Sequence, residues 1–285
     1  MKTISLTFLT FFSFFSCLIN AQESRLFMPK KIKQAYENNT RSFDGKPGEN
    51  YWQNTVDYTI KVSVDVANNE LEGSESLVYH NTSPDEINML VIRLYANVFK
   101  KGSPRANSVK AEDLTDGVEL FDVLINGIKI DLTSRKSVMR RGTNLFLSLD
   151  KPLASGADLT LEAKWKQKIP HYDGREGIID STSFFIGYWY PQVSVYDDIF
   201  GWDRLNYTLQ TEFYNNLANF DVEISAPKNF AVWATGILEN PDKVLPKEIE
   251  KRFIKAKTSD VPIAIIKKED IENGFEARKN TWHFT

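Results

Sequence analysis

Residues 57–66 (DYTIKVSVDV) alternate almost strictly between apolar and polar side chains, and this constrains the fold more than any other feature of the sequence. Successive side chains of a β-strand point to opposite faces, so a period of two predicts a strand that is buried on one side only. The residues of the apolar face are Tyr58, Ile60, Val62, Val64 and Val66. Asn68-Asn69 then predicts a turn into a partner strand that ends at residues 77–79.

The same alternation recurs along the chain. It predicts further strands at 90–94, 145–149, 159–165, 209–214, 220–224 and 231–235. Asn126-Gly127 between two short apolar pairs is the strongest hairpin signal in the sequence. We found no repeat of fixed period. The pattern therefore predicts an all-β chain: one large, mostly antiparallel domain.

Two segments break this pattern. Residues 31–37 suggest one short helix, and residues 246–258 (PKEIEKRFIKAKT) predict a charged surface helix with Pro246 in its first turn. At the C-terminal end of the sequence, residues 281–284 (TWHF) have the composition of a strand interior and are followed by one residue. Because such rings need partners, we expect a following element to cover them and the chain to be the front part of a longer protein.

The N-terminus predicts export. Lys2 precedes an apolar run over residues 4–19, and Ala21 offers a small residue for cleavage, so residues 1–21 are interpreted as a signal peptide. Cys17 lies within the signal and raises lipidation as an alternative, but Phe14 occupies the position where a small aliphatic residue is usual. We expect no transmembrane segment in the mature chain. The final compartment stays open between the periplasm, the cell surface and the extracellular space.

After the signal, residues 22–50 form a polar lead-in segment and residues 51–285 form the β domain. The mature chain has no cysteine, so an exported product is stabilised by its core without disulfides. The formal net charge is −3 and the basic residues are scattered, which argues against a nucleic-acid-binding surface. A small cluster at Lys30, Lys31 and Lys33 is best interpreted as a solvated flank.

Residues 184–203 (FFIGYWYPQVSVYDDIFGWD) contain eight aromatic residues, against 13% aromatic content for the whole chain. We call this stretch the aromatic ledge. It is typical either of a core strand followed by an aromatic-rich turn or of a buried wall beside a cleft. The adjacent acids Asp197 and Asp198 are predicted to point to opposite faces if they lie in a strand.

Catalytic groups are scarce. His80, His171 and His283 are isolated and the zinc-binding pattern HExxH is absent, so no intrinsic metal site is predicted. The sequence also lacks G-x-S-x-G, a mature cysteine nucleophile and a phosphate-binding glycine loop. Whether any two carboxyl groups face each other across a cleft, as glycoside hydrolysis requires, is not decided by sequence.

Residues 51–285 resemble the N-terminal β domain of the aminopeptidase N family of zinc metallopeptidases, the gluzincins. The resemblance is carried by YTIKVSVDVANNELEGSESLVYHN at 58–81, YWYPQVSVYDDIFGWD at 188–203, EFYNNLANFDVEISAPKNFAVWATG at 212–236 and the terminal TWHF. It implies a saddle-like β-sandwich that precedes a thermolysin-like catalytic domain. That domain would carry the zinc ligands and the exopeptidase motif, none of which occurs in these 285 residues.

The resemblance also implies a contribution to the substrate pocket. In that family a Gln three residues before a Pro lines the pocket for the free amino-terminal residue of the peptide. With Pro191 as that Pro, Tyr188 stands at the Gln position, with Trp189 and Tyr190 as its neighbours. A phenol can accept a hydrogen bond from an ammonium group or offer its ring face, but it has no amide carbonyl. Asp203 matches an acid in the family's Phe-Asp segment, and a structural role is expected for it.

Two functions follow as hypotheses. In the first, the chain is the N-terminal domain of a secreted zinc aminopeptidase that acts on peptides; alone it would be inactive, bind no zinc and expose an apolar face near Trp282 and Phe284. In the second, it is a complete secreted β-sandwich module without enzymatic activity that binds glycans or protein partners. Trp189, Trp202 and Trp233 would then form a stacking platform.

Overall fold

The computed structural model describes residues 27–171 and 174–285, and the predicted signal peptide lies outside the described residues. The largest element is a seven-stranded sheet in the order β15-β14-β1-β2-β8-β4-β5. Its strands are β15 (Thr281–Phe284), β14 (Ala218–Ser225), β1 (Thr55–Asp65), β2 (Glu70–His80), β8 (Asp158–Lys168), β4 (Glu119–Ile125) and β5 (Ile128–Lys129). All of these pairings are antiparallel except β1 with β14, which is parallel.

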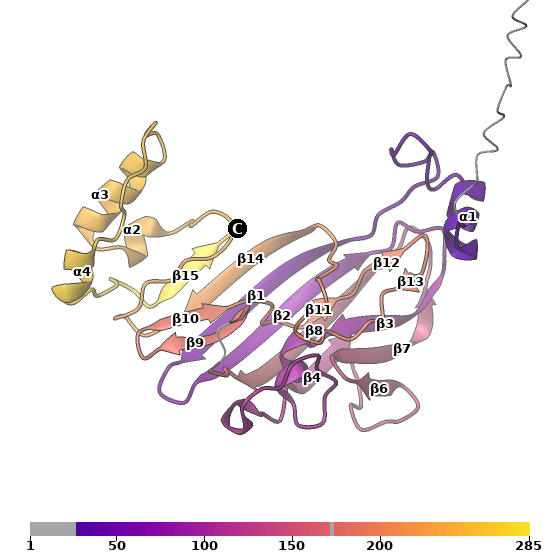
Figure 1. The fold of residues 1–285 in the computed structure, drawn as a ribbon, viewed down its shortest axis with the longest axis horizontal. Helices are drawn as coiled ribbons and strands as arrows, with labels where there is room; N and C mark the ends of the chain where they lie inside the picture. The colour runs from indigo at the N-terminus through magenta and orange to yellow at the C-terminus, as the bar shows by residue number, and fades with distance from the viewer. Residues whose placement is uncertain (1–26, 172–173) are drawn as a thin grey trace, which may run out of the picture.

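A four-stranded sheet lies against this large sheet (Figure 1). Its order is β11-β3-β7-β6, with β11 (Gln192–Val193), β3 (Ile87–Arg93), β7 (Asn144–Leu153) and β6 (Val138–Arg141). Two further pairs are short hairpins: β9 (Glu176–Asp180) with β10 (Ser183–Ile186), and β12 (Tyr196–Asp197) with β13 (Gly201–Trp202). The predicted all-β, mostly antiparallel sandwich is therefore confirmed.

The main core lies between the two sheets and is built from the alternating faces seen in the sequence. Tyr58 and Ile60 of β1 pack with Leu77 of β2 and Leu161 of β8, and each is 3% exposed or less. Strand β3 differs, because Leu90, Val91 and Ile92 are all buried and its alternation does not mark a solvent face. Asn126 and Gly127 adopt φ values of +49° and +76° in the β4–β5 turn, and this confirms the predicted hairpin.

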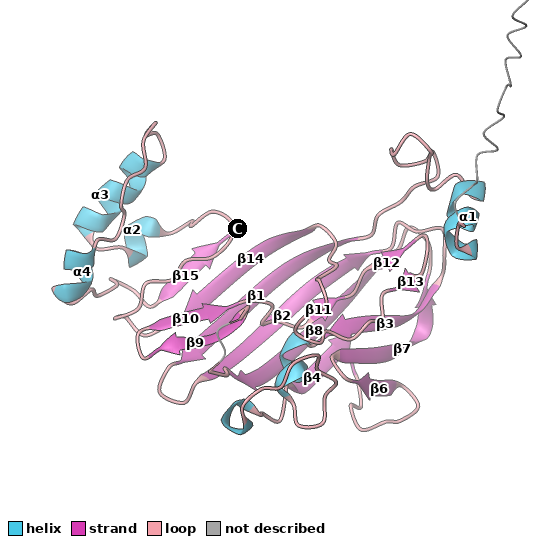
Figure 2. Cartoon of the chain, in the orientation of Figure 1, coloured by secondary structure: helices cyan, strands magenta, loops and turns pink. Residues whose placement is uncertain are grey.

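The four α-helices of the described residues lie at the two ends of the molecule (Figure 2). Helix α1 (Lys30–Glu37) confirms the predicted helix of the lead-in segment. Helices α2 (Pro241–Val244), α3 (Lys247–Ala256) and α4 (Lys268–Glu272) lie beside β15, and α3 is the predicted surface helix, with Pro246 directly before it. Two 3₁₀ turns, η1 (Tyr95–Phe99) and η2 (Ala111–Asp113), follow β3.

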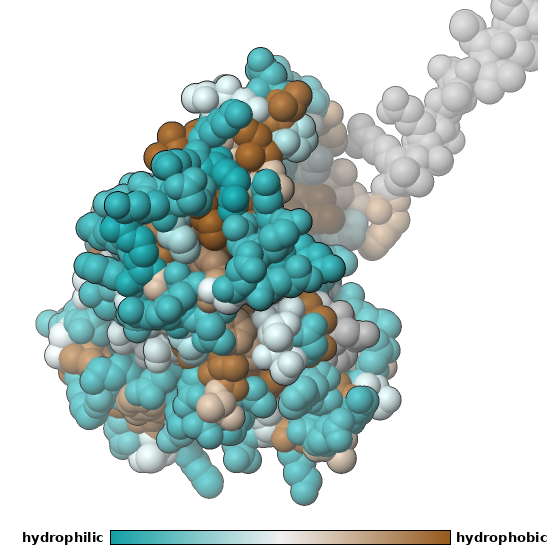
Figure 3. All heavy atoms as spheres, turned by 90° about the vertical axis from the view of Figure 1, so that its left-hand side faces the viewer, coloured by the Kyte–Doolittle hydropathy of each residue, from teal (hydrophilic) through white to brown (hydrophobic). Residues whose placement is uncertain are grey.

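The expectation of an exposed apolar face at β15 is wrong. Trp282 is 0% and Phe284 3% exposed, because they pack against Val244, Leu245 and Ile249 of the helical segment that precedes them in the chain. Hydrophilic atoms cover most of the helical end, and hydrophobic atoms show there in a few separate patches (Figure 3). The partners that the rings of β15 require thus come from residues 238–277.

Two predicted strands are also wrong. Residues 209–214 are irregular, because Leu209 takes a φ of +74° and Phe213 turns into an aromatic cluster instead of pairing with a neighbouring strand. Residues 231–235 contain no strand either. They line one side of the groove described below and are followed by Gly236, whose φ is +98°. Alternation alone did not distinguish these aromatic-rich segments from strands.

Candidate functional site

The aromatic ledge crosses the molecule as a series of short strands and turns. It includes most of β10, passes through β11 and the β12–β13 hairpin, and lies beside β1 and β14 in space (Figure 1). Near its start Gly187 approaches the backbone of Arg175 so closely that a Cβ there would lie 2.5 Å from the Arg175 carbonyl oxygen. Gly187 therefore permits the sharp turn that directs the next three side chains.

Tyr188 follows with a φ of +53°, a left-handed conformation that is uncommon for a bulky residue. Its ring stacks on Phe213 at a centroid distance of 3.5 Å and meets Tyr95 in a T-shaped contact at 5.5 Å. Tyr207 completes the cluster by packing on both Tyr95 and Phe213. Residues with a strained backbone that is fixed by packing occur preferentially at binding sites, so the conformation of Tyr188 makes the aromatic ledge a candidate binding site.

Trp189 and Tyr190 pack toward the large sheet. Trp189 stacks on Trp165 of β8 at 6.2 Å, while Tyr190 meets Tyr58 of β1 at 5.4 Å and Phe220 of β14 at 5.8 Å. Burial raises the pKa of the Tyr190 phenol well above its usual range, so the hydroxyl stays protonated. These contacts hold the two rings in fixed positions.

The three predicted residues line one open groove of about 1410 Å³. Its other walls come from β1, β10, β14 and the segment 230–236. The structure thus brings Tyr188, Trp189 and Tyr190 together at one surface hollow, although Tyr188 also lines a small neighbouring cavity with Tyr95 and Phe213. A groove of this size exceeds the pockets of roughly 300–1,000 Å³ that hold typical small molecules.

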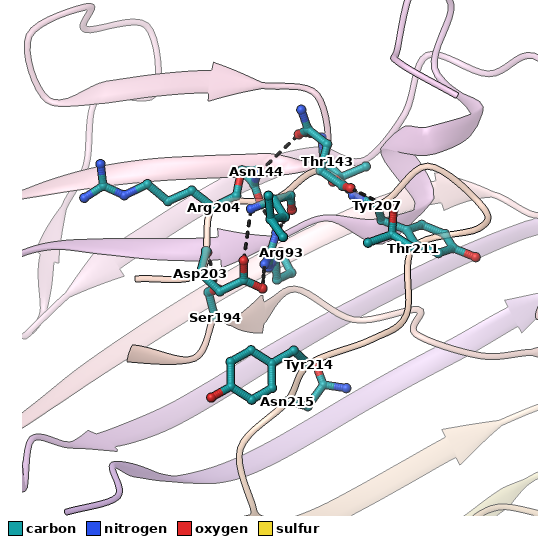
Figure 4. Close-up of polar contacts among 12 residues, drawn as sticks. Arg93, Thr143, Asn144, Ser194, Asp203, Arg204, Tyr207, Thr211, Tyr214 and Asn215 are labelled. Atoms are coloured by element: carbon teal, nitrogen blue, oxygen red, sulfur yellow. Dashed lines mark hydrogen bonds and ion pairs between the residues drawn. The ribbon is translucent and has the colours of Figure 1, made fainter. Parts of the chain in front are cut away.

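Arg93 attaches the ledge to the four-stranded sheet (Figure 4). It is 3% exposed, forms an ion pair with Asp203, and donates hydrogen bonds to Asn144 Oδ1 at 2.5 Å and to the Leu205 carbonyl. Ser194 Oγ donates to the Asp203 carbonyl at 2.6 Å and fixes the backbone of the same residue. These contacts give Asp203 the structural role that was expected.

The adjacent acids Asp197 and Asp198 make separate contacts. Asp197 accepts hydrogen bonds from the backbone N–H groups of residues 199 and 200 and from the Tyr214 hydroxyl. Asp198 instead accepts hydrogen bonds from Arg41 and Thr40 of the lead-in segment, at distances of 2.5 to 2.9 Å. Burial opposes the charge of Asp198, yet these hydrogen bonds and the Arg41 charge lower its pKa. Asp198 therefore anchors the lead-in segment to the ledge, whereas Asp197 fixes the turn that follows it.

Two buried acids were not anticipated from sequence. Glu75 is 4% exposed on the core face of β2 and neither carboxyl oxygen has a hydrogen-bond partner among the described residues. Burial raises its pKa well above the ordinary value. Burial also raises the pKa of Glu176 to about 8, and this carboxyl accepts a hydrogen bond of 3.2 Å from Gln167. Glu75 lies two residues from both Gly73 and Leu77, so the period of two places all three on the buried face of β2. This spacing was the sequence signal that could have predicted its burial.

The three histidines stay apart from the groove. His80 lies between Asp158, at 2.8 Å from Nδ1, and Asp57, at 3.0 Å from Nε2, and the hydrogen bond with Asp57 is the main reason that its pKa is raised. His171 and His283 lie near one carboxylate each. Over residues 27–171 and 174–285 no group of three or more His, Cys, Asp or Glu side chains is arranged to hold a metal ion. We therefore assign no zinc ligand in this part of the chain.

The stacking platform predicted for a glycan-binding module is not formed. Trp202 is 6% exposed and packs on Tyr79 and Tyr196 within the main core, while Trp189 and Trp233 line the groove. None of the helices in the described part of the chain is long and apolar enough to cross a membrane.

The groove offers a ligand mainly apolar contacts, with a few polar side-chain atoms among them.

Comparisons with known proteins gave similarity at the level of solved structures. No protein-family model matches the chain, and the comparison with curated proteins found no match. A variant of a two-domain M1 zinc metallopeptidase bound to L-tryptophan shares 13% identity over 68% of this chain and 38% of its own, with a TM-score of 0.38. A variant of the M1 zinc metallopeptidase from Deinococcus radiodurans bound to a Tyr-Ser-Ala substrate gives 12% identity, coverages of 68% and 38%, and a TM-score of 0.36.

The M1 zinc metallopeptidase from Deinococcus radiodurans without a named ligand gives 12% identity, coverages of 68% and 37%, and a TM-score of 0.37. This chain therefore spans well under half the length of these structures.

Proposed function

We propose that this chain is the N-terminal, substrate-pocket-contributing domain of a secreted zinc-dependent aminopeptidase, which removes N-terminal residues from peptides. The observation that supports the proposal most is the position of the ledge motif YWYPQVSVYDDIFGWD. The residue at the family's Gln position, Tyr188, lines an open groove and is fixed there in an uncommon backbone conformation. The order of the sequence motifs at 58–81, 188–203 and 212–236 supports the same proposal.

In this proposal the chain binds and orients the peptide, and the hydrolytic groups belong to a catalytic domain outside these residues. Zinc bound in such a domain would activate a water molecule to attack the first peptide bond, with a Glu as general base. The described residues contribute no ligand to it. Export depends on residues 1–21, and the product acts in the periplasm, at the cell surface or outside the cell.

Tyr188 anchors the free amino group of the substrate through its phenol oxygen. Phe213 covers one face of the Tyr188 ring at a centroid distance of 3.5 Å, so that face does not receive a cation. The oxygen can accept a hydrogen bond from the ammonium group in place of the amide oxygen of a Gln. Trp189 and Tyr190 supply the apolar wall beside it.

The test is the zinc-dependent hydrolysis of aminoacyl substrates by the complete gene product. Tyr188→Phe preserves the ring stack and removes the oxygen, so KM should rise by about fivefold to tenfold with little change in kcat. Tyr214→Phe removes a hydroxyl that is bonded to Asp197 outside the groove and should leave both constants unchanged. Equal kinetics for wild type and Tyr188→Phe would remove Tyr188 from substrate binding, and an absence of zinc-dependent hydrolysis would remove the proposed activity.

A further inference from the structure

Glu75 lies on the core face of β2 with no group that could share its charge. The residue is 4% exposed, and neither carboxyl oxygen has a hydrogen-bond partner among the described residues. A carboxylate in such a place would be costly, because it would lose its hydration and gain no donor in return. The group is therefore an uncharged acid in the folded chain, and the aminopeptidase function assigns it no role.

The aromatic ledge covers this acid. Tyr58 of β1 and Trp165 of β8 lie diagonally across from Glu75 on the same face of the large sheet. Tyr190 meets the Tyr58 ring at a centroid distance of 5.4 Å, and Trp189 stacks on Trp165 at 6.2 Å. The ledge thus covers both neighbours of the buried carboxyl, and its two rings also line the groove.

Two titratable groups face Glu75, the phenols of Tyr58 from β1 and Tyr190 from the ledge. Burial raises the pKa of both phenols, and the nearby Glu75 carboxyl adds to that rise, so both hydroxyls stay protonated. Burial alone raises the pKa of Glu75, and no lysine, arginine or histidine of the described residues offsets it. An ionised Glu75 would therefore need water.

The ledge is the least firmly held of the elements around Glu75. Strand β2 is paired with β1 and β8 from its first residue to its last, whereas the ledge pairs with β3 only at Gln192 and Val193. One more contact is the hydrogen bond from the Val193 N–H to the Tyr58 hydroxyl, at 3.0 Å. Tyr188 holds a φ of +53° that a displaced segment need not keep. Local opening occurs where such contacts are few, so water reaches Glu75 most readily by displacement of the ledge.

We propose that Glu75 and ledge residues 188–193 form a pH-sensitive latch. The latch is closed while the carboxyl holds its proton, and it opens when the carboxyl releases that proton to water and becomes hydrated. Opening breaks the contact between the Val193 N–H and the Tyr58 hydroxyl and moves the ledge rings away from the groove wall. The latch is a property of this chain alone and goes beyond the aminopeptidase function.

The direction of the pH dependence follows from proton binding. In the closed state Glu75 keeps its proton up to its raised pKa, whereas in the open state it ionises near its ordinary pKa of 4.5. Opening therefore releases one proton between these two pH values, and its equilibrium constant should rise about tenfold for each pH unit in that window. Below pH 4.5 both states hold the proton and the constant should not change with pH.

Internal hydrogen bonds provide a competing response. The Trp165 indole N–H has no hydrogen-bond partner among the described residues, and the Tyr58 and Tyr190 hydroxyls are close enough to influence Glu75. If these groups turned to donate to an ionised Glu75, the ledge would stay closed at every pH. The two responses differ in whether the ledge amides become accessible to water.

The experiment is backbone hydrogen exchange, measured by NMR on the complete 285-residue chain from pH 5.5 to 7.5. Each rate is divided by the intrinsic exchange rate at the same pH, which gives the opening constant of each amide. The Val193 N–H reports the latch, and the amides of β2 report unfolding of the large sheet. Glu75→Gln and Glu75→Met remove the titrating group. Glu72→Gln, on the exposed face of the same strand, and Glu176→Gln, at the second buried acid, are the controls.

The opening constant of Val193 in wild type should rise about 100-fold over these two pH units and exceed that of the β2 amides throughout. It should not change with pH in Glu75→Gln or Glu75→Met. The Met variant replaces the acid by an apolar side chain of similar length, so it tests the latch even if the buried amide of Gln prevents folding. Glu72→Gln and Glu176→Gln should keep the wild-type slope.

Three results would overturn the latch. A Val193 opening constant that does not change with pH in wild type would assign the response to the internal hydrogen bonds. A slope that survives in the Glu75 variants, or is lost in Glu176→Gln, would place the titrating group elsewhere. Equal opening constants for Val193 and the β2 amides would show global unfolding in place of a local opening. None of these readouts depends on hydrolysis, so a failure here is distinguishable from a failure of the aminopeptidase proposal.

Discussion

Replacing Arg93 by Met should destabilise the fold strongly, because the Arg93 guanidinium donates to three acceptors around the ledge: the Asp203 carboxylate, Asn144 Oδ1 and the Leu205 carbonyl. The Leu205 N–H also donates to Asp203 Oδ1, at 3.0 Å, but it carries no charge that could replace the guanidinium. The Asp203 side chain is only 15% exposed. Removing one partner of a buried ion pair leaves an uncompensated charge and costs about 3–5 kcal/mol. This is a large part of the roughly 5–15 kcal/mol by which proteins are normally stable.

Equilibrium unfolding in urea, followed by tryptophan fluorescence, measures this cost. With an m-value of about 2–3 kcal/mol/M, the Arg93→Met midpoint should fall by about 1–2 M. The double variant Arg93→Met with Asp203→Leu removes the stranded charge and should recover most of the loss. Lys61→Met is the matched control: the Lys61–Glu223 pair spans 3.2 Å with side chains 65% and 40% exposed, so its loss should change stability by about 0.5 kcal/mol or less.

The reasoning fails if Arg93→Met unfolds within about 1 kcal/mol of wild type. It fails equally if the double variant is no more stable than the single one, because the cost would then come from lost packing and not from the unpaired Asp203 carboxylate.

Three further predictions concern stability. The pKa of His80 is raised in the folded protein above its ordinary value of 6.5. Its contribution to the free energy of unfolding, about 1 kcal/mol or less, is therefore fully present below pH 6.5 and is lost as pH rises through the folded pKa. Urea unfolding measured from pH 5.5 to 9 should show this fall for wild type and not for His80→Gln. Folded Glu176 has a pKa of about 8 against an ordinary 4.5, so folding loses stability as pH rises from 4.5 to 8; Glu176→Gln should therefore stabilise the chain at pH 7, by on the order of 3 kcal/mol, and equal stability at pH 7 would contradict the burial argument. Gly73→Ala places a Cβ 2.5 Å from the Trp165 ring and should cost about 1–3 kcal/mol in thermal or urea unfolding; stability equal to that of wild type would show that the Trp165 ring can move aside.

The parts of the fold that sequence predicted are those governed by local periodicity. The strand at residues 57–66, its partner after Asn68-Asn69 and the Asn126-Gly127 hairpin each follow from side-chain alternation and turn chemistry, and the structure confirms them. The parallel pairing of β1 with β14 was not predictable in this way, because it joins segments more than 150 residues apart and leaves no local signal.

The candidate site was predicted in part. The density of rings in residues 184–203 left two interpretations open, a core strand with an aromatic-rich turn or a wall beside a cleft. In the structure part of the stretch packs into the core and part of it lines the groove. The left-handed backbone of Tyr188 and the contact with Phe213 were not foreseen, since residues 209–214 had the composition of a strand. The burial of Trp282 was missed for a similar reason: its partners lie in helices whose charged sequence suggested only a solvated surface.

The central claim is that this chain provides the peptide-binding domain of a zinc aminopeptidase. The most direct measurement is to sequence the coding DNA downstream of codon 285. The account predicts an in-frame continuation that encodes a helical HExxH motif followed by a downstream Glu, the three-ligand pattern of a catalytic zinc site. A stop codon at that point, or a continuation without such a motif, would contradict it.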